Sequence, residues 1–187
     1  MSLKTAVSAA LITLVSQSAA VADAITIGTI RVDFSDPAQR PTTSAEKHFA
    51  EAYLAAARKR DIAAMRALVH PASLACASSD ANREHLDTVL SRPFRHDIPA
   101  DARLAFANVP DAEQHVPTNG LLTLPAVPKR IFVLDYKWLQ KDDDGKVTRS
   151  VGMTVVRLLA PDADTLKLAE YCLTPDGEAK YRANRPR

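Results

Sequence analysis

The pattern of apolar and polar positions is clearest between Thr43 and Cys76, where it predicts two consecutive helices. Thr43 or Ser44 can cap the first helix, and Asp61 can cap the second. In each helix the apolar residues recur at the spacing of one buried helical face. These residues are Phe49, Ala52, Tyr53 and Ala56, then Ile62, Met65, Leu68 and Val69. Because proline cannot continue a helix, we expect the second helix to end before Pro71.

Two shorter helices are predicted further along the chain. Ser78-Ser79-Asp80 can cap a third helix that runs to about Leu90, where Arg92-Pro93 stops it. Thr174-Pro175 is typical of the start of a C-terminal helix, because a proline in the first turn gives up no backbone hydrogen bond.

The rest of the chain favours strands. Runs rich in β-branched and aromatic residues, several with alternating polarity, predict strands. They cover residues 25–34, 100–109, 120–124, 130–140, 146–159 and 165–172. The strongest signal is the hairpin of 130–140 and 146–159, whose turn over 141–145 contains Gly145 at a position that favours positive φ. Helices followed by an antiparallel meander indicate an α+β fold.

The helical opening resembles the NTF2-like (SnoaL-like, cystatin-like) superfamily. The resemblance lies in Ala52, Tyr53, Ala56, Arg60-Asp61, Met65, Leu68 and His70-Pro71. It implies a curved sheet that wraps the long helix and leaves a cone-shaped cavity, and it implies that the sheet can form a homodimer. A tetratricopeptide unit has a similar helix pair, but no second copy recurs at a fixed spacing, and such repeats need stacked neighbours.

The first 22 residues have the organisation of a secretory signal peptide. Lys4 precedes an apolar run over residues 6–15, and Ala20-Val21-Ala22 or Ala22-Asp23-Ala24 offers a cleavage site. We therefore expect a periplasmic or secreted protein with an extended lead-in over 23–42 and one domain over 43–187. No other segment is long and apolar enough to predict a stable membrane span.

Export changes the interpretation of the two cysteines. An oxidising compartment favours a disulfide between Cys76 and Cys172. Closing a loop of roughly a hundred residues is worth about 4–5 kcal/mol in the chain-entropy account, often less in practice. The alternative is a catalytic thiol at Cys76, although no family-specific sequence surrounds it.

Composition and motifs exclude several functions. The 187-residue chain has a formal charge of +2, with acids and bases interleaved, which gives no basic stripe for nucleic acid. Glycine is scarce and no phosphate-binding loop or GxSxG motif occurs, so no cofactor is expected. The acidic run 142–144 fits turn chemistry rather than a calcium loop. No histidine pair has metal-ligand spacing, and we expect His85, His96 and His115 to be solvated or capping residues.

One carboxylate is a candidate for catalysis. Asp135 lies in phase with apolar residues of its strand. A carboxylate in an apolar cone has a raised pKa and can act as a general base. Its candidate partners are His48, Tyr53 and Arg157. The alternative is that Asp135 and Lys137 mark the solvent face of the strand, with the aromatic residues turned to the core.

Three classes of function remain open. The first is a non-catalytic exported module that binds a small apolar ligand or a partner protein, and it predicts an apolar cavity. The second is a cofactor-free lyase or isomerase, which requires at least two ionisable groups converging in a closed cone. The third is an inhibitor or immunity protein for a secreted enzyme, which predicts an exposed loop over residues 110–128. The sparse chemistry favours the first class over an enzyme.

Overall fold

The computed structural model describes residues 23–111 and 120–184. The predicted signal peptide over 1–22 and the centre of the predicted 110–128 loop therefore lie outside the described residues, as does His115. Among the described residues, no helix combines the length and apolar character that crossing a bilayer requires.

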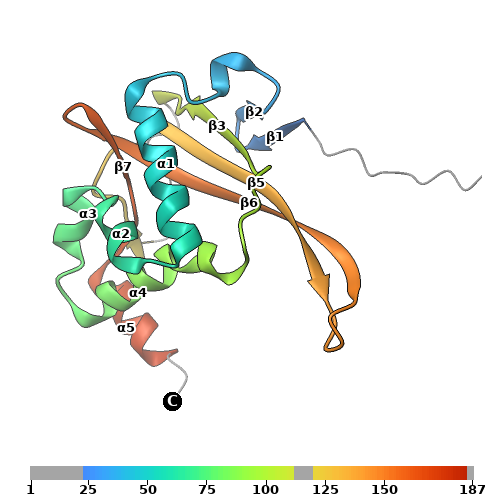
Figure 1. Cartoon of the computed structure of the whole chain (residues 1–187). Coiled ribbons are helices and arrows are strands. Elements are labelled where there is room, and N and C mark those ends of the chain that lie inside the picture. The colour runs from blue at the N-terminus through green and yellow to red at the C-terminus, as the bar shows by residue number, and fades with distance from the viewer. Residues whose placement is uncertain (1–22, 112–119, 185–187) are drawn as a thin grey trace, which may run out of the picture.

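A four-stranded antiparallel sheet organises the fold, in the order β3-β5-β6-β7 (Figure 1). The strands are β3 (Arg103–Asn108), β5 (Arg130–Lys141), β6 (Val147–Asp162) and β7 (Thr165–Leu168). The predicted hairpin of 130–140 and 146–159 is confirmed, with Gly145 at a φ of 78°, and the structure pairs Arg130 with Leu159 and Leu139 with Ser150. With the helices that precede and flank the sheet, this arrangement confirms the α+β class.

In residues 23–111 and 120–184, five α-helices accompany the sheet. They are α1 (Ser44–Lys59), α2 (Ile62–Ala67), α3 (Pro71–Cys76), α4 (Asp80–Leu90) and α5 (Pro175–Ala183). The predicted caps are present: Thr43 forms a capping box with Glu46, and Asp61, Ser79 and Thr174 each accept a hydrogen bond from the first turn of their helix. Polar side chains at these positions determine where the helices begin.

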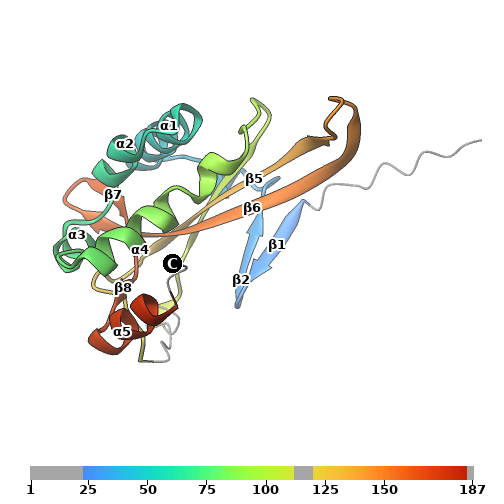
Figure 2. The ribbon, with the colours of Figure 1, turned by 90° about the horizontal axis from the view of Figure 1, so that it is seen from below.

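The two faces of the sheet are covered differently. Phe49 and Tyr53 of α1 pack against Phe132 of β5 on the helical face, with ring centroids 5.4 and 5.1 Å apart. On the other face Val133 packs with Val32 of the N-terminal hairpin, which covers residues 24–33. Figure 2 shows this hairpin and helix α1 on opposite sides of β5 and β6. The sheet is therefore the middle layer of the molecule.

The extended lead-in is a hairpin rather than one strand. It consists of β1 (Ala24–Ile27) and β2 (Ile30–Asp33), with Ile27 directly opposite Ile30. Gly28 takes a φ of 60° in the two-residue turn, a conformation open to glycine at little cost. The single strand predicted over 25–34 was wrong because this glycine allows the chain to reverse.

Pro71 begins a third short helix, α3, that the sequence pattern did not predict. The proline is the first residue of α3, and His70 Nδ1 accepts a hydrogen bond from the Ala72 backbone N–H at 3.1 Å. A proline that ends one helix can thus open the next, because its missing N–H is not needed in a first turn.

The final predicted strand, 165–172, is divided between two sheets. β7 ends at Leu168, and β8 (Cys172–Leu173) pairs instead with β4 (Leu122–Thr123). Residues 169–171 connect the two strands. The described part of the chain also contains two 3-10 helices, η1 (Pro37–Gln39) and η2 (Arg92–Arg95).

Candidate functional site

Asp135 does not face the helices. Phe132 and Tyr136 occupy the helical face of β5, so Asp135, which is out of phase with them, points to the opposite face. There Asp135 Oδ2 lies 2.5 Å from Arg103 Nη2, and Oδ1 accepts a hydrogen bond from Thr154 Oγ1 at 2.8 Å. The Asp135 carboxylate is therefore held between β3 and β6.

The four candidate catalytic residues do not form one group. His48 is exposed on α1, and Asp135 is separated from Tyr53 by the sheet. Only Tyr53 and Arg157 meet, because Arg157 pairs with Phe132 across the sheet and so projects toward α1. Of the four candidate residues, Tyr53 and Arg157 are therefore in contact, whereas Asp135 and His48 lie away from them.

Arg157 is the centre of a buried polar cluster. Its Nε donates to the Tyr53 hydroxyl at 3.2 Å, and its Nη2 donates to the Val89 carbonyl oxygen at 3.0 Å. Its Nη1 lies 3.6 Å from Glu170 Oε1. Arg157 and Glu170 are 7% and 8% exposed and Tyr53 is fully buried. Every nitrogen of the guanidinium group therefore has a protein partner.

Contacts with α3 and the nearby disulfide fix the position of the Glu170 backbone. Ser73 Oγ donates to the Glu170 carbonyl oxygen at 3.0 Å and accepts from the Glu170 backbone N–H at 3.2 Å. Cys76 at the end of α3 is bonded to Cys172, two residues beyond Glu170, with the Cα atoms 6.2 Å apart. This confirms the predicted disulfide. The bond and the Ser73 hydrogen bonds together fix α3 against residues 169–172.

Burial determines the electrostatics of this cluster. Loss of water raises the pKa of Glu170, although the charges of Arg157 and Arg92 oppose the rise. Burial likewise raises the pKa of Tyr53, again against the charge of Arg157. The cluster therefore contains a carboxyl group that takes up a proton more readily than a glutamate in water.

A pocket of about 260 Å³ opens beside Arg157 and Glu170. Its lining comes from α4 and η2, from β4, from β6 and from the 169–171 connection. The apolar walls are Val89, Leu122, Val156, Leu158 and Ala169, and the polar lining is His85, Arg92, Arg157, Glu170 and Tyr171. Leu122 belongs to the predicted 110–128 loop, whose last part thus forms one wall of the pocket.

Three polar side chains in this pocket are available to a ligand. His85, Arg92 and Tyr171 form no side-chain hydrogen bond or ion pair with another residue in the described part of the chain. Burial lowers the pKa of His85, and the nearby charge of Arg92 lowers it further. Burial also raises the pKa of Tyr171, with Glu170 acting in the same direction. A neutral imidazole and a protonated phenol result, and both can donate a hydrogen bond.

His85 was expected to be a solvated or capping residue, and its side chain caps no helix in the described chain. It is half-buried, lines the pocket and meets the ring of Tyr181 edge-on at 6.1 Å. His96, from the same expectation, stacks on Trp138 with ring centroids 3.8 Å apart. The tertiary neighbours of both rings lie far away in sequence, so local spacing did not reveal them.

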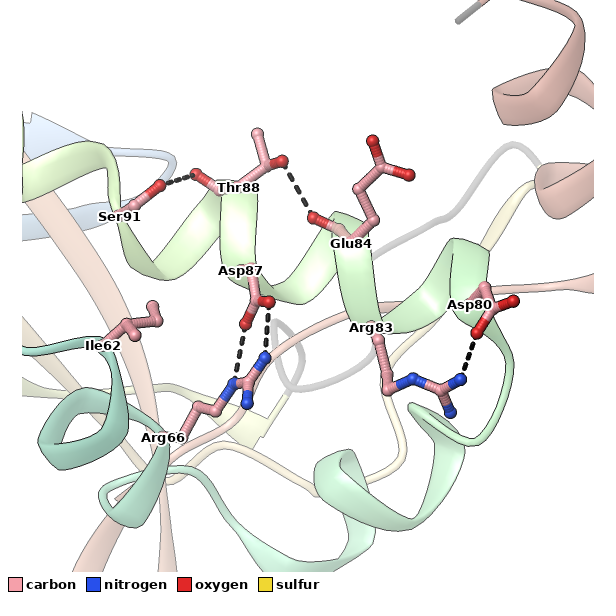
Figure 3. Close-up of a pocket in the computed structure, with 8 residues that line it drawn as sticks. All are labelled: Ile62, Arg66, Asp80, Arg83, Glu84, Asp87, Thr88 and Ser91. Carbon is pink, nitrogen blue, oxygen red and sulfur yellow. Dashed lines mark hydrogen bonds and ion pairs between the residues drawn. The ribbon is translucent and has the colours of Figure 1, made fainter.

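A larger and more open pocket of about 660 Å³ lies between α2 and α4 (Figure 3). The two arginines that line this pocket already form ion pairs with aspartates of the same protein. Arg66 Nε and Nη2 contact the two oxygens of Asp87 at 2.7 and 2.5 Å, and Arg83 pairs with Asp80 (Figure 3). A ligand there would have to replace these ion pairs, so the smaller pocket is the better candidate site.

Metal ligands do not come together in the part of the chain that the structure describes: no group of three or more His, Cys, Asp or Glu side chains could hold an ion there. The candidate site is therefore built from hydrogen-bonding groups, a cation and apolar walls.

Sequence reasoning missed Glu170, although a signal for it exists. Glu170 alternates in phase with Leu166, Leu168 and Cys172, which is the same signal that pointed to Asp135. The sequence therefore places two carboxylates, Asp135 and Glu170, in phase with apolar residues. Of these two, only Glu170 is buried on the helical side of the sheet. Arg92 and Tyr171 carry no comparable sequence signal.

Comparison of the chain with family models, with curated proteins and with solved structures finds no match in any of the three. The functional conclusion therefore depends on the chemistry of the pocket.

Proposed function

We propose that this chain is an exported, NTF2-like module that binds a small molecule in the pocket beside Arg157 and Glu170. The observation that carries the proposal is the lining: apolar walls surround His85, Arg92 and Tyr171, whose polar atoms have no protein partner in the described chain. Ligand sites typically combine apolar walls with a few polar groups that fix orientation.

Two further observations support parts of this proposal. The disulfide between Cys76 and Cys172 fits the oxidising environment that the predicted signal peptide implies. The packing of Phe49 and Tyr53 from α1 against the sheet is the arrangement that the NTF2-like resemblance predicts. Binding rather than catalysis is favoured because each nitrogen of the Arg157 guanidinium group already has a protein partner.

The test is to purify the chain from the periplasm of an expressing bacterium and to measure retained small molecules by native mass spectrometry. A fragment set is then titrated by NMR. Val89→Trp fills the pocket from α4 and should abolish binding, whereas Thr88→Trp on the exposed side of α4 should not. Equal binding by the wild type and Val89→Trp would show that ligands bind elsewhere.

A cofactor-free lyase or isomerase is the second candidate, and the pKa of Glu170 favours it. Burial raises this pKa above its ordinary value, which suits a carboxylate that removes a proton next to a carbonyl group. Such an enzyme exchanges that substrate proton with deuterium in D₂O. We expect Glu170→Gln to stop the exchange while ligand binding persists, and exchange at the wild-type rate in the variant would exclude Glu170 as the base.

The pocket differs from both expectations for these classes. It is not the purely apolar cavity expected of a simple binder, because an ion pair lines it. The ionisable pair expected of an enzyme is present, but Arg157 Nη1 and Glu170 Oε1 lie 3.6 Å apart in an ion pair rather than in a hydrogen bond. The deuterium exchange measurement separates the two classes.

A further inference from the structure

We infer that the ligand of this pocket is a small monocarboxylate with an apolar body, whose carboxylate pairs with Arg92 and accepts hydrogen bonds from His85 and Tyr171. This inference rests on the proposed binding function and deepens it by naming the chemical class of the ligand. It depends on which charges in the pocket are already neutralised and which are free.

The charges of the pocket lining leave one cation without a counter-ion. Two guanidinium groups and one carboxylate line the pocket, so its formal charge is one positive. Glu170 forms an ion pair with Arg157, which also donates hydrogen bonds to the Tyr53 hydroxyl and to the Val89 carbonyl oxygen. Arg92 is exposed and has no ion-pair partner in the described chain. The uncompensated charge is therefore that of Arg92, and it favours a ligand with a single negative charge.

Arg92 is placed to act together with the other free groups. Arg92, His85 and Glu170 line the same pocket. Tyr171 is a fourth polar residue of this lining. A carboxylate accepts several hydrogen bonds at once and pairs with a guanidinium group in a bidentate manner. The side chains of Arg92, His85 and Tyr171 thus match one carboxylate.

The remaining surface describes the rest of the ligand. Val89, Leu122, Val156 and Leu158 provide apolar walls next to the polar groups. The volume of about 260 Å³ is below the roughly 300–1,000 Å³ of sites for drug-sized molecules. A benzoate-like or short fatty-acid-like molecule satisfies both the size and the polarity of this space.

The test compares acids with amides of the same shape. Benzoate and benzamide, then hexanoate and hexanamide, are titrated into the disulfide-bonded full-length mature protein by calorimetry or NMR. We expect each acid to bind at least about tenfold more tightly than its amide, a difference of about 1.4 kcal/mol. Arg92→Gln should remove the preference. Arg95→Gln should keep it, because Arg95 is an exposed neighbour in η2 that does not line the pocket.

A pH profile gives an independent reading. The groups around His85 are Arg92, Arg157, Glu170, Tyr171 and Tyr181. A bound carboxylate adds a negative charge and raises the His85 pKa, so acid binding should take up protons and tighten as the pH falls toward 6, while amide binding should not.

The outcomes distinguish the inference from the function. If acid and amide bind equally, or if Arg92→Gln leaves their ratio unchanged, the carboxylate inference is wrong and the binding function stands. If neither class binds at millimolar concentration and no small molecule is retained after purification, the binding function is wrong as well.

Discussion

At the scale of single residues, the structure depends on how Arg157 is satisfied. A buried guanidinium group is tolerated only when its donors have partners and its charge has a counter-ion. Tyr53, Val89 and Glu170 supply these from three different elements. Burial works against the charge of Arg157, but Tyr53 and Glu170 outweigh it and leave the pKa of Arg157 above its ordinary value. Arg157 therefore joins α1, α4 and the 169–171 segment.

Replacing Arg157 with methionine should cost about 3–5 kcal/mol of unfolding free energy, because Glu170 and the Tyr53 hydroxyl would remain buried without their partner. Urea unfolding measures the loss. Arg92→Gln is the control and should change stability by less than about 0.5 kcal/mol, as expected for an exposed residue. A loss below about 1 kcal/mol for Arg157→Met would mean that the cluster contributes little to the fold.

The same variant should respond to pH in a defined direction. Burial raises the pKa of Glu170, and removal of the Arg157 charge would raise it further. A group with a raised pKa in the folded state stabilises the fold below its unfolded pKa, and this contribution disappears as the pH rises through the folded pKa. The stability deficit of Arg157→Met should therefore shrink as the pH falls from 7 toward 5, as urea titrations at several pH values can check.

Gly177 is a second position where one atom matters. A Cβ on this residue of α5 would overlap the carbonyl oxygen of Leu121, so the helix would have to move away from β4. We expect Gly177→Ala to destabilise the protein by about 1–3 kcal/mol despite the better helix propensity of alanine. Thermal unfolding measures it. Gly152→Ala is the matched control, because no atom lies within 4 Å of its added Cβ, and a comparable loss there would refute the overlap.

At the scale of elements, the β5–β6 hairpin extends beyond the strands that support it (Figures 1 and 2). β3 pairs with β5 only as far as Asp135, and β7 pairs with β6 only from Leu159 onward. All residues from Leu139 to Ser150 are exposed, Leu139 to 59%. A two-stranded ribbon without a third strand or a packed face is only marginally stable. The outer part of the hairpin therefore contributes little to the stability of the domain.

This arrangement predicts that the hairpin tip can be removed. Leu139 lies directly opposite Ser150, so replacing residues 140–149 with Asn-Gly leaves a two-residue turn of the type that hairpins favour. We expect the unfolding free energy to change by less than about 1 kcal/mol, which is roughly 2–4 °C in Tm for a chain of this size. Calorimetry on the shortened chain provides the measurement. A much larger loss would show that the tip packs against something, and size-exclusion chromatography would reveal a second copy.

At the scale of the whole molecule, one covalent bond joins the helical half to the end of the sheet region. The disulfide spans 96 residues of sequence and connects α3 to β8, next to the segment that carries Glu170 and Tyr171. Since α3 is only six residues long, its position depends on this bond and on Ser73 rather than on its own helix stability. The pocket wall formed by 169–171 depends on the same two contacts.

Replacing both cysteines with serine should therefore lower the unfolding free energy by up to about 4–5 kcal/mol, the value expected for a loop of this length. Denaturant unfolding measures the loss, and reduced wild type should behave like the double variant. In the oxidised protein, mass measurement with and without reductant should differ by two hydrogen atoms. Free thiol labelling of unreduced, unfolded protein would contradict the bond.

Local sequence patterns were enough to predict α1, α2, α4 and α5 from their caps and apolar faces, the β5–β6 hairpin from its turn, and the disulfide from the number of cysteines. The other features depend on contacts between distant segments. A period of two shows that Asp135 and Glu170 each share a face with apolar residues, but it cannot show which face meets the helices. That choice depends on contacts between distant segments, such as Arg157 with Tyr53, and it placed Glu170 rather than Asp135 at the pocket.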